Sequence, residues 1–443
     1  MAQQVAPLTT PPGLSALYNA CRNIYRDQPN PLQVTAVVKF WLGGPDPLDY
    51  ISMYSNPGDS SRNIPPHWHY VSFGLSDLHG DGRVHEISGP DSPSGFGIEL
   101  TFRLKKGSET TPPTWPAVIM QSLSKYVFQT ENTLFPGDHI SQHGTLDGRE
   151  GGKMTHLLLV EDPQLGTVGT CFGEVTFVQL VGITSEELTA AQQWNGPRVA
   201  NLLRKFPGGG GAWLVTDMDR SVSLTDDPAM SAEIEEGINH EGSNLSAVSA
   251  QCTWNETHHP NSLVESMGQL SVGETGASSD GCFGRDISQS EREMIKAALT
   301  RGLAQAAEGE CRLDPSIRNV FPPSLSTRTL GGVRFNLNLE AAGLLPLALR
   351  GRIRHGRHFT FKSVSGETAV TLVAPAVTGA FTSPREPYVA HGPWLHVLVQ
   401  EELAETMLKD VNDLLLQKHL SLPVDLQWPE YGLTVTIMPD QLS

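Results

Sequence analysis

The sequence predicts an α+β protein with two domains, each built around a mixed sheet. Its length of 443 residues exceeds what a single hydrophobic core usually sustains. Helical and strand-like segments mix within two patterned regions, and a Ser-, Gly- and Glu-rich stretch lies between them. Aliphatic and aromatic residues make up 39% of the chain and charged residues 18%, so each region can bury a core.

The first domain is expected at residues 11–242, after a disordered N-terminus at 1–10. Apolar residues spaced by three and four after Pro11 predict an amphipathic helix. Residues 96–105 alternate between apolar and polar side chains, which predicts a half-buried strand. Residues 115–129 have helical periodicity, so helices and strands mix in this domain.

The second half of the first domain has clearer boundaries. THLLLVED and CFGEVTFVQLVGI predict strands, and TSEELTAAQQWNG predicts a helix. Thr184 and Glu187 have the spacing of a capping box, and Gly196 is expected to stop this helix. The Gly208–Gly211 run lacks the Lys-Ser/Thr of a phosphate-binding loop, so it is interpreted as a flexible turn before a last strand, WLVTD.

The second domain is expected to carry a disordered insertion. Apolar residues alternate again from Val333, and further segments predict a helix-like GLLPLALRGRIRHG, three strands, an amphipathic helix and a closing strand, LTVTIM. Its expected parts are the start of the domain at 243–254, a flexible loop at 255–284, a helix at 285–304, a flexible insertion at 305–328 and the main body at 329–443.

Charge and composition exclude several classes of function. The formal charge of −17 disfavours a protein that coats nucleic acid or anionic lipid. The five cysteines have no CxxC spacing and are interpreted as reduced thiols. Neither a secretory signal nor an apolar run of membrane-spanning length is found in the sequence. We therefore expect a cytoplasmic protein that can enter the nucleus, with no direct nucleic-acid or membrane partner.

The run IPPHWHYVSFGLSDLHGDGRVHE raises the hypothesis of a metal site. Period 2 places His67 and His69 on one face of a strand, where neutral imidazoles can share a zinc or iron ion. Further ligand types follow at Asp77, His79, Asp81 and His85. The alternative is that both histidines pack and form hydrogen bonds at a sheet edge. A metal-dependent enzyme is thus the alternative function, although the sequence contains no GxSxG elbow or cysteine-protease signature.

Two clusters of opposite charge favour the binding of another protein. The basic cluster consists of Arg350, Arg352, Arg354, His355, Arg357, His358 and Lys362. The acidic and polar cluster consists of Tyr126, Glu131, Asp138, His139, Glu161 and Asp162. Exposed carboxylates beside a strand edge can receive a peptide that carries His, Arg or hydroxyl groups, and a functionally neutral loop is the alternative. For the basic cluster the alternative is a solvated helix end with cations near its C-terminus.

Several long strings of the sequence resemble the Suppressor of fused family. They include NPLQVTAVVKFWLGGPDPLDYISMY, IPPHWHYVSFGLSDLHGDGRVHE, SGFGIELTFRLK, PPTWPAVIMQSL, QQWNG, WLVTDM, GSNLSAVSA, RGRIRHGRHFTFKS and HGPWLHVLV. The similarity runs from about residue 11 to residue 438 and leaves out mainly 255–330. It implies a non-catalytic negative regulator of Hedgehog signalling, without a cofactor, whose two domains close around a partner peptide.

The resemblance implies a partner and a binding mode. The expected partners are Gli or Cubitus interruptus transcription factors, bound through a SYGHL-type peptide that adds as a β-strand between the domains. The implied contact residues are Tyr126, Asp138, Glu161, Leu344, Arg350, Arg352, His355, Arg357 and Thr360. We expect Asp138 and Glu161 to hold the histidine and hydroxyls of the peptide, while the arginines draw the domains together.

The resemblance also raises further expectations. Fused-type kinases and Costal-type kinesins are candidate partners, and a monomer is expected. Bacterial proteins share the first domain without a Hedgehog pathway, so another client protein is an alternative. The presence of the second domain favours the role in Hedgehog signalling.

Overall fold

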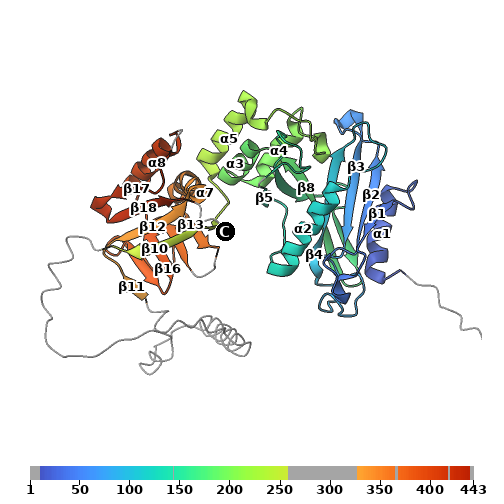
Figure 1. Cartoon of the computed structure of the whole chain (residues 1–443), viewed down its shortest axis with the longest axis horizontal. Helices are drawn as coiled ribbons and strands as arrows, with labels where there is room; N and C mark the ends of the chain where they lie inside the picture. Colours follow the sequence, from blue (N-terminus) through green and yellow to red (C-terminus); the bar gives the residue numbers. More distant parts are fainter. Residues whose placement is uncertain (1–9, 143, 258–326, 365–367, 418–419, 440–443) are drawn as a thin grey trace, which may run out of the picture. The chain divides into compact units, whose positions relative to one another are not determined.

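The computed structural model describes residues 10–142, 144–257, 327–364, 368–417 and 420–439. They form two compact units, of which the first comprises residues up to Ser246 together with Leu349–His355, and the second comprises the rest (Figure 1). The flexible loop expected at 255–284, the helix expected at 285–304 and the insertion expected at 305–328 lie mostly outside the described residues, as does the N-terminus expected at 1–10. Where they are described, Asn255 and Glu256 belong to β10 (Cys252–Glu256) and Thr327 and Arg328 to β11 (Thr327–Thr329), so the expectation of flexible loops was wrong at these ends.

The segment Leu349–His355 belongs to the first unit, whereas the sequence analysis placed it in the second domain. The backbone N–H of Ser243 donates to the Gly351 carbonyl oxygen over 2.8 Å. The Arg350 side chain reaches Glu235, which is 115 positions earlier in the chain. Periodicity cannot reveal such a distant contact, so the domain boundary drawn from the sequence alone was wrong for these residues.

The first unit is built on a mixed sheet with the strand order β1-β2-β3-β4-β8-β6-β5, and β7 pairs with β8. Only β4 and β8 run parallel, while the other neighbours are antiparallel. The strands are β1 (Leu32–Thr35), β2 (Tyr50–Asn56), β3 (His67–Phe73), β4 (Pro93–Lys105), β5 (His139–Ser141), β6 (His156–Glu161), β7 (Thr167–Thr170) and β8 (Gly173–Ile183). The short strand β5 forms one edge of this sheet.

Helices cover both faces of this sheet (Figure 1). Helix α2 (Trp115–Thr130) packs on the apolar face of β3, β4 and β8. The opposite face is covered near β3 by α1 (Pro12–Ile24) and near β6 by three helices. Those three are α3 (Ser185–Gln193), α4 (Gly196–Lys205) and α5 (Pro228–Glu241). Two covered faces explain why most of the central strands are buried.

The second unit contains two sheets. The four-stranded sheet has the order β10 (Cys252–Glu256), β12 (Val333–Asn338), β18 (Leu433–Met438) and β17 (Val424–Trp428). The six-stranded sheet has the order β11 (Thr327–Thr329), β15 (Tyr388–His391), β16 (Trp394–Leu398), β14 (Ala369–Val373), β13 (His358–Ser363) and β9 (Ala247–Ala250). Its helices are α7 (Leu339–Ala342) and α8 (Glu401–Leu415), whereas the π-helix at Leu347–Arg352 begins in this unit and continues into the Leu349–His355 segment of the first unit.

The α+β class and most long elements agree with the sequence prediction. The helix predicted at 115–129 is α2, and the capping box of Thr184 and Glu187 forms at the start of α3. Gly196 was expected to stop a helix, but it begins α4, because Asn195 accepts a hydrogen bond from the Arg198 N–H as the N-cap. The strand predicted at WLVTD is also wrong: only Thr216 forms a bridge, to Leu104.

Strand β4 differs most from its prediction. Its alternating pattern indicated one buried and one solvated face, yet Glu99, Thr101 and Arg103 on the polar face have no exposed surface. This face lies on the α1 side of the sheet together with Val71 and Phe177. The pattern of apolar residues identified the strand correctly but missed a polar layer inside the protein.

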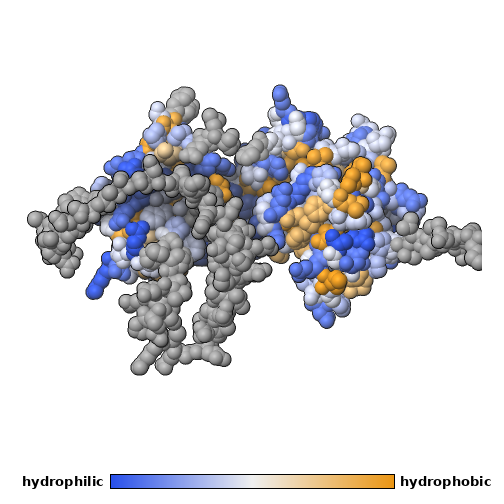
Figure 2. Space-filling model, turned by 60° about the horizontal axis from the view of Figure 1, so that its bottom comes forward, coloured by the Kyte–Doolittle hydropathy of each residue, from blue (hydrophilic) through white to orange (hydrophobic). Residues whose placement is uncertain are grey.

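No helix in the described part of the chain is long and apolar enough to cross a membrane. Large apolar side chains are nevertheless exposed on the first unit, and Figure 2 shows several apolar patches on its surface. The most exposed of them are Leu32, Val37, Leu42, Ile87, Val118 and Phe135.

Candidate functional site

The edge strand β5 and the residues before it form an open edge of the first unit. On its inner side β5 pairs with β6, with His139 opposite Leu158. The pairing continues before the strand, because the Gly137 N–H donates to the Leu159 carbonyl and the Leu159 N–H donates to the Asp138 carbonyl. Since β5 ends the strand order, no described strand pairs with its outer side. Such an edge offers backbone donors and acceptors to an added strand.

Asp138 and Glu161 place two carboxylates beside this edge. Asp138 is exposed, and its Oδ2 accepts a 2.8 Å hydrogen bond from the Phe135 N–H, which fixes the side chain over the preceding turn. Glu161 is exposed at the end of β6, two positions beyond Leu159. Neither carboxylate forms an ion pair with another described residue, so both negative charges are available to a ligand.

Tyr126 lies in the last turns of α2, just before the loop that leads to β5. Its side chain is 44% exposed, and its hydroxyl accepts a 3.1 Å hydrogen bond from the Asn132 amide. Leu134 anchors the same loop in the core, whereas Phe135 is exposed. The structure therefore brings an aromatic ring and a carboxylate to the two ends of one loop.

Three of the expected contact residues belong to the second unit. Thr360 and Arg357 lie on and just before β13, and the next strand, β9, is the end of the six-stranded sheet. Thr360 is opposite Ala247 of β9, and its hydroxyl shares a 3.0 Å hydrogen bond with Thr371. Leu344 is half-buried just after α7. This unit thus offers a second strand edge with polar and apolar neighbours.

The remaining three residues, Arg350, Arg352 and His355, lie together in the segment of the first unit defined above. Arg350 Nη2 donates to Glu235 Oε2 over 2.7 Å and to Asn239 Oδ1 over 2.8 Å. Arg352 is buried, and its Nη1 donates to the Ser243 carbonyl over 2.9 Å. His355 lies against Gly242, which has no room for a β-carbon. These contacts attach the segment Leu349–His355, called the basic segment below, to the end of α5.

The histidines of the metal hypothesis are part of a buried hydrogen-bond network. His67 Nδ1 contacts the Pro65 carbonyl at 2.8 Å, and its Nε2 is 2.9 Å from Arg103 Nη1. His69 Nδ1 is 2.8 Å from the Tyr25 hydroxyl, and its Nε2 is 3.1 Å from Asp162 Oδ2. All four ring nitrogens have protein partners, and a guanidinium lies beside both rings. Their strand, β3, is in the middle of the sheet. The sequence analysis had placed the two histidines at a sheet edge, which is wrong.

The protonation states in this network follow from burial and from the charge of Arg103. Burial, together with the charge of the neighbouring Arg103 guanidinium, lowers the pKa of His67 to about 3 and that of His69 to about 4. Burial alone would raise the pKa of Asp162, but Arg103 and His69 hold it far below its ordinary value. At neutral pH the network therefore contains one cation, one anion and two neutral rings, and the His69–Asp162 contact is a hydrogen bond and not an ion pair.

The other ligand types in that run do not converge on the two histidines. His85 Nε2 contacts the Gly74 carbonyl at 3.1 Å, and Asp81 pairs with Arg83 at the surface. His79 lies 3.6 Å from Asp49. Among the described residues, no three His, Cys, Asp or Glu side chains are arranged to hold a metal ion. The geometry supports the structural interpretation of the run.

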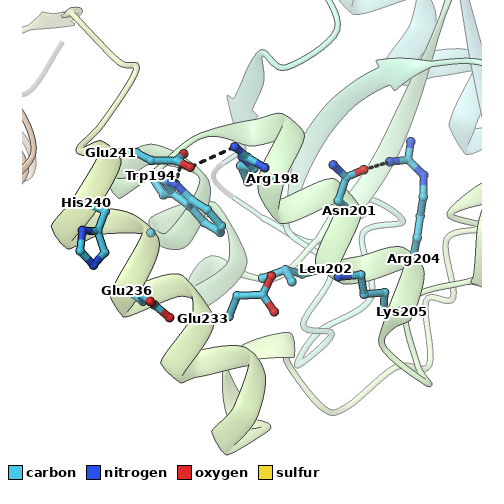
Figure 3. A pocket seen from close by; sticks show the side chains of 11 residues that line it. Trp194, Arg198, Asn201, Leu202, Arg204, Lys205, Glu233, Glu236, His240 and Glu241 are labelled. Atoms are coloured by element: carbon cyan, nitrogen blue, oxygen red, sulfur yellow. Dashed lines mark hydrogen bonds and ion pairs between the residues drawn. The ribbon is translucent and has the colours of Figure 1, made fainter.

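A groove of about 620 Å³ lies between α4 and α5 (Figure 3). Glu241 accepts hydrogen bonds from Trp194 Nε1 at 2.8 Å and from Arg198 Nη2 at 3.0 Å. Gly237 of α5 approaches the Trp194 ring so closely that a β-carbon would overlap it. The groove mixes charges of both signs from facing helices and contains none of the expected contact residues. Nothing in the sequence patterns indicated it, because neither α4 nor α5 was predicted.

Comparisons with known proteins agree on one family. Residues 44–221 match the family model "Suppressor of fused protein (SUFU)", and residues 232–437 match the model "Suppressor of Fused Gli/Ci N terminal binding domain". The "Suppressor of fused homolog" proteins of Homo sapiens and Mus musculus are each 48% identical over 453 residues, which cover 97% of this chain and 92% of theirs. The crystal structure of Drosophila Suppressor of Fused superposes with a TM-score of 0.71 at 38% identity and covers 98% of both chains.

Proposed function

Because this chain belongs to the Suppressor of fused family of Hedgehog-pathway regulators, we propose that it represses the pathway by binding Gli-type transcription factors. The bound element is a SYGHL-type peptide, which adds as a β-strand. The family model that matches residues 232–437 carries the description of a Gli/Ci N-terminal binding domain, which supports this partner.

The observation that carries the proposal is the open edge of β5 with the Asp138 carboxylate beside it. A strand added to this edge forms main-chain hydrogen bonds, which supply affinity without regard to sequence. Asp138 and Glu161 then supply specificity, since exposed carboxylates without a cationic partner can accept bonds from a histidine ring or a hydroxyl. The edge strand β9 of the second unit is the counterpart for the other side of the peptide.

Apolar positions of the peptide contact Tyr126 and Leu344 in this proposal, and Thr360 and Arg357 lie beside the β9 edge. Arg350, Arg352 and His355 have a different role. The existing bonds of Arg350 to Glu235 and of Arg352 to Ser243 hold the basic segment on the first unit. We therefore assign Arg350, Arg352 and His355 to the positioning of the basic segment. Both ends of this segment lead directly into the second unit.

The proposal extends to the cellular context of the protein. Sequestration of a transcription factor requires the protein in the cytoplasm, and repression of bound factor requires it in the nucleus, so we propose both locations. Fused-type kinases and Costal-type kinesins are further proposed partners. A protein that acts by holding its partner needs neither a cofactor nor a catalytic residue.

The test is a fluorescence anisotropy titration of a labelled SYGHL peptide with the full chain. We expect Asp138→Asn to weaken binding about tenfold, because it removes one charge-assisted hydrogen bond of about 1.5–3 kcal/mol. Asp138→Arg adds repulsion of the peptide and should weaken binding about a hundredfold or more. Glu150→Arg makes the same charge change at another exposed carboxylate and serves as the matched control. Equal affinity of Asp138→Arg and Glu150→Arg would overturn the assignment.

A further inference from the structure

A second cavity, of about 570 Å³, lies in the first unit at the C-terminal end of α4. Its walls come from the β2–β3 connection, the end of β4, the end of α4 with the glycine loop 208–211 that follows it, and residues 215 and 217. The residues that matter for its chemistry are Ile64, Lys105, Arg204, Lys205, Gly208 and Asp217. None of them is among the residues assigned to peptide binding above.

The glycine loop 208–211 is a closely packed wall of this cavity and not the flexible turn expected from the sequence. A β-carbon at Gly209 would overlap the Leu203 carbonyl of α4. Gly210 has φ +82° and lies against the Val215 backbone, while Gly211 has φ +67° and lies against the Asn63 carbonyl. Gly209, Gly210 and Gly211 are therefore needed where the loop meets other backbone segments, so packing fixes the shape of this wall.

The cavity carries an excess of positive charge. Lys105, Arg204 and Lys205 line it, and Asp217 is the only carboxylate among the described residues of its lining. Asp217 Oδ2 is 2.6 Å from Lys105 Nζ, which compensates that cation. Neither Arg204 nor Lys205 pairs with a carboxylate in the described part of the protein. Two uncompensated cations at one cavity are notable in a chain with a net charge of −17.

Arg204 is the better defined of the two cations. Its guanidinium is half-buried and donates a 2.7 Å hydrogen bond to Asn201 Oδ1, a neutral acceptor. Burial lowers the pKa of Arg204 below its ordinary value. Cations in the last turn of a helix do favour the helix dipole, which accounts for Arg204 and Lys205 in isolation. The helix dipole explains neither the presence of Lys105, which belongs to β4, nor the close packing of the glycine loop 208–211.

The cavity also has apolar walls. Ile64, Pro65 and Phe206 line it, and its volume exceeds that of a phosphate ion. Gly208 and Gly210 line it as well, and their N–H groups donate to no acceptor among the described residues. The cations and the apolar wall together match a phosphate group that is attached to a peptide chain.

We propose that this cavity binds a phosphorylated serine or threonine in a segment of a partner protein. The phosphate dianion matches the two uncompensated cations, and the residues flanking it contact the apolar wall. Helix α4 lies between this cavity and the β5 edge. Gly196 at the start of α4 packs against Gly137, which comes just before β5, whereas Arg204 and Lys205 are at the end of α4. At 1.5 Å per residue the two ends are about 15 Å apart. The inference therefore does not depend on the function proposed above.

The test uses the full chain, isotopically labelled, and a mixture of phosphoserine peptides with degenerate flanking residues. The amide NMR signals of Gly208 and Gly210 should shift when the phosphorylated mixture is added. They should not shift with the same peptide mixture in its unphosphorylated form. Inorganic phosphate, added alone, should shift the same signals only at concentrations at least about tenfold higher, since it lacks the flanking contacts. Equal apparent affinity for inorganic phosphate and for the phosphopeptides would overturn the assignment to a peptide.

Four variants make the test specific. Arg204→Gln and Lys205→Gln should each weaken phosphopeptide binding on the order of tenfold. Asp217→Asn releases Lys105 and should tighten binding several-fold. Arg198→Gln, on the same helix but outside this cavity, is the control and should leave affinity unchanged. Absence of any shift, or Arg204→Gln and Lys205→Gln variants that bind like Arg198→Gln, would overturn the proposal. SYGHL peptide affinity should be unaffected in all four variants, which separates this test from that of the peptide site.

Discussion

Arg103 Nη2 donates hydrogen bonds of 2.9 Å to both carboxylate oxygens of Asp162, and both side chains are fully buried. The ion pair lies on the α1 side of the sheet of the first unit, with His67 and His69 on the neighbouring strand. Asp162 also accepts from the backbone N–H groups of Gln164 and Leu165, so its charge is compensated on several sides. A buried pair of this kind is costly to break, because the remaining charge has no solvent.

Asp162→Asn should destabilise the first unit by about 3–5 kcal/mol, since it leaves the Arg103 guanidinium buried without its anion. The measurement is the free energy of unfolding from urea titration followed by tryptophan fluorescence. Asp219→Asn breaks the exposed pair between Asp219 and Arg149 and provides the control, for which little change is expected. Equal unfolding midpoints for the two variants would show that the buried pair contributes nothing.

Stability should fall as the pH is lowered from about 6.5 toward 4. The pKa of His69 in the folded protein is about 4, below its ordinary value of 6.5, and that of His67 is about 3. Between these values the unfolded chain binds protons that the folded protein does not, so stability is complete above pH 6.5 and is lost as the pH falls. Asp162, whose pKa is also lowered, adds to the loss below about pH 4.

This dependence is measured as the urea midpoint at pH 7, 6, 5 and 4.5. His69→Gln should flatten the profile, whereas the exposed His240→Gln should reproduce the wild-type profile. A midpoint that stays constant between pH 7 and pH 5 would contradict the assignment of neutral, buried imidazoles.

Glu187→Ala should destabilise the first unit by about 3 kcal/mol or more. Glu187 is the third residue of α3, where it completes the capping box with Thr184, and it is also fully buried beside Arg220, with which it forms an ion pair. It accepts from the Leu224 N–H as well, over 2.9 Å. The loss therefore exceeds the roughly 1 kcal/mol of a helix cap alone. Chemical denaturation of Glu187→Ala and of its exposed neighbour Glu186→Ala tests this, and similar losses in both would refute it.

Gly242→Ala should detach the basic segment from the first unit. Gly242 has φ +67°, and a β-carbon there would overlap the Gly351 carbonyl and the His355 ring. Hydrogen exchange at the Ser243 amide, which donates to Gly351, should become much faster. Gly169→Ala, where nothing lies near the added carbon, should leave that exchange unchanged. Unchanged protection of Ser243 in Gly242→Ala would show that the segment is held by other contacts.

Local sequence patterns were sufficient to predict helices whose spacing and capping residues lie close together in the chain. Helix α2 follows from apolar spacing, and the capping box of α3 from two residues three positions apart. The start of α5 was missed although its signal was present: Asp227 accepts from the N–H groups of Ala229 and Met230, and Pro228 follows it. Gly196 was misjudged because a glycine can begin a helix as well as end one.

The buried polar layer could not be read from the sequence. Arg103 occupies a polar position in the alternating pattern of β4, where a residue on a solvated face would also be found. Its partner Asp162 lies 59 positions away in the chain. Only the pairing of β3 with β4 brings His69 opposite Arg103. Hydrophobic periodicity reports which side chains are apolar, and it is silent about polar side chains that compensate one another.

The candidate site, too, could be predicted only in part, because some of its features depend on tertiary contacts. Glu161 was noted as a charge at the end of a predicted strand and Asp138 as a charge at a turn, and the resemblance implied both as contact residues. The structure places Asp138 directly before β5 and Glu161 at the end of the neighbouring strand β6. The basic cluster was identified by composition, but its contact with α5 depends on a tertiary contact between Arg350 and Glu235. The role of these arginines therefore required the structure.

The central claim is that a partner peptide adds as a strand to the β5 edge. Hydrogen exchange of the full chain with and without a saturating SYGHL peptide tests it most directly, because an added strand protects the amides it bonds. We predict slower exchange in residues 139–141 of β5 and 247–250 of β9, and no such change with Asp138→Arg. Binding of the peptide without protection of β5 would contradict the account.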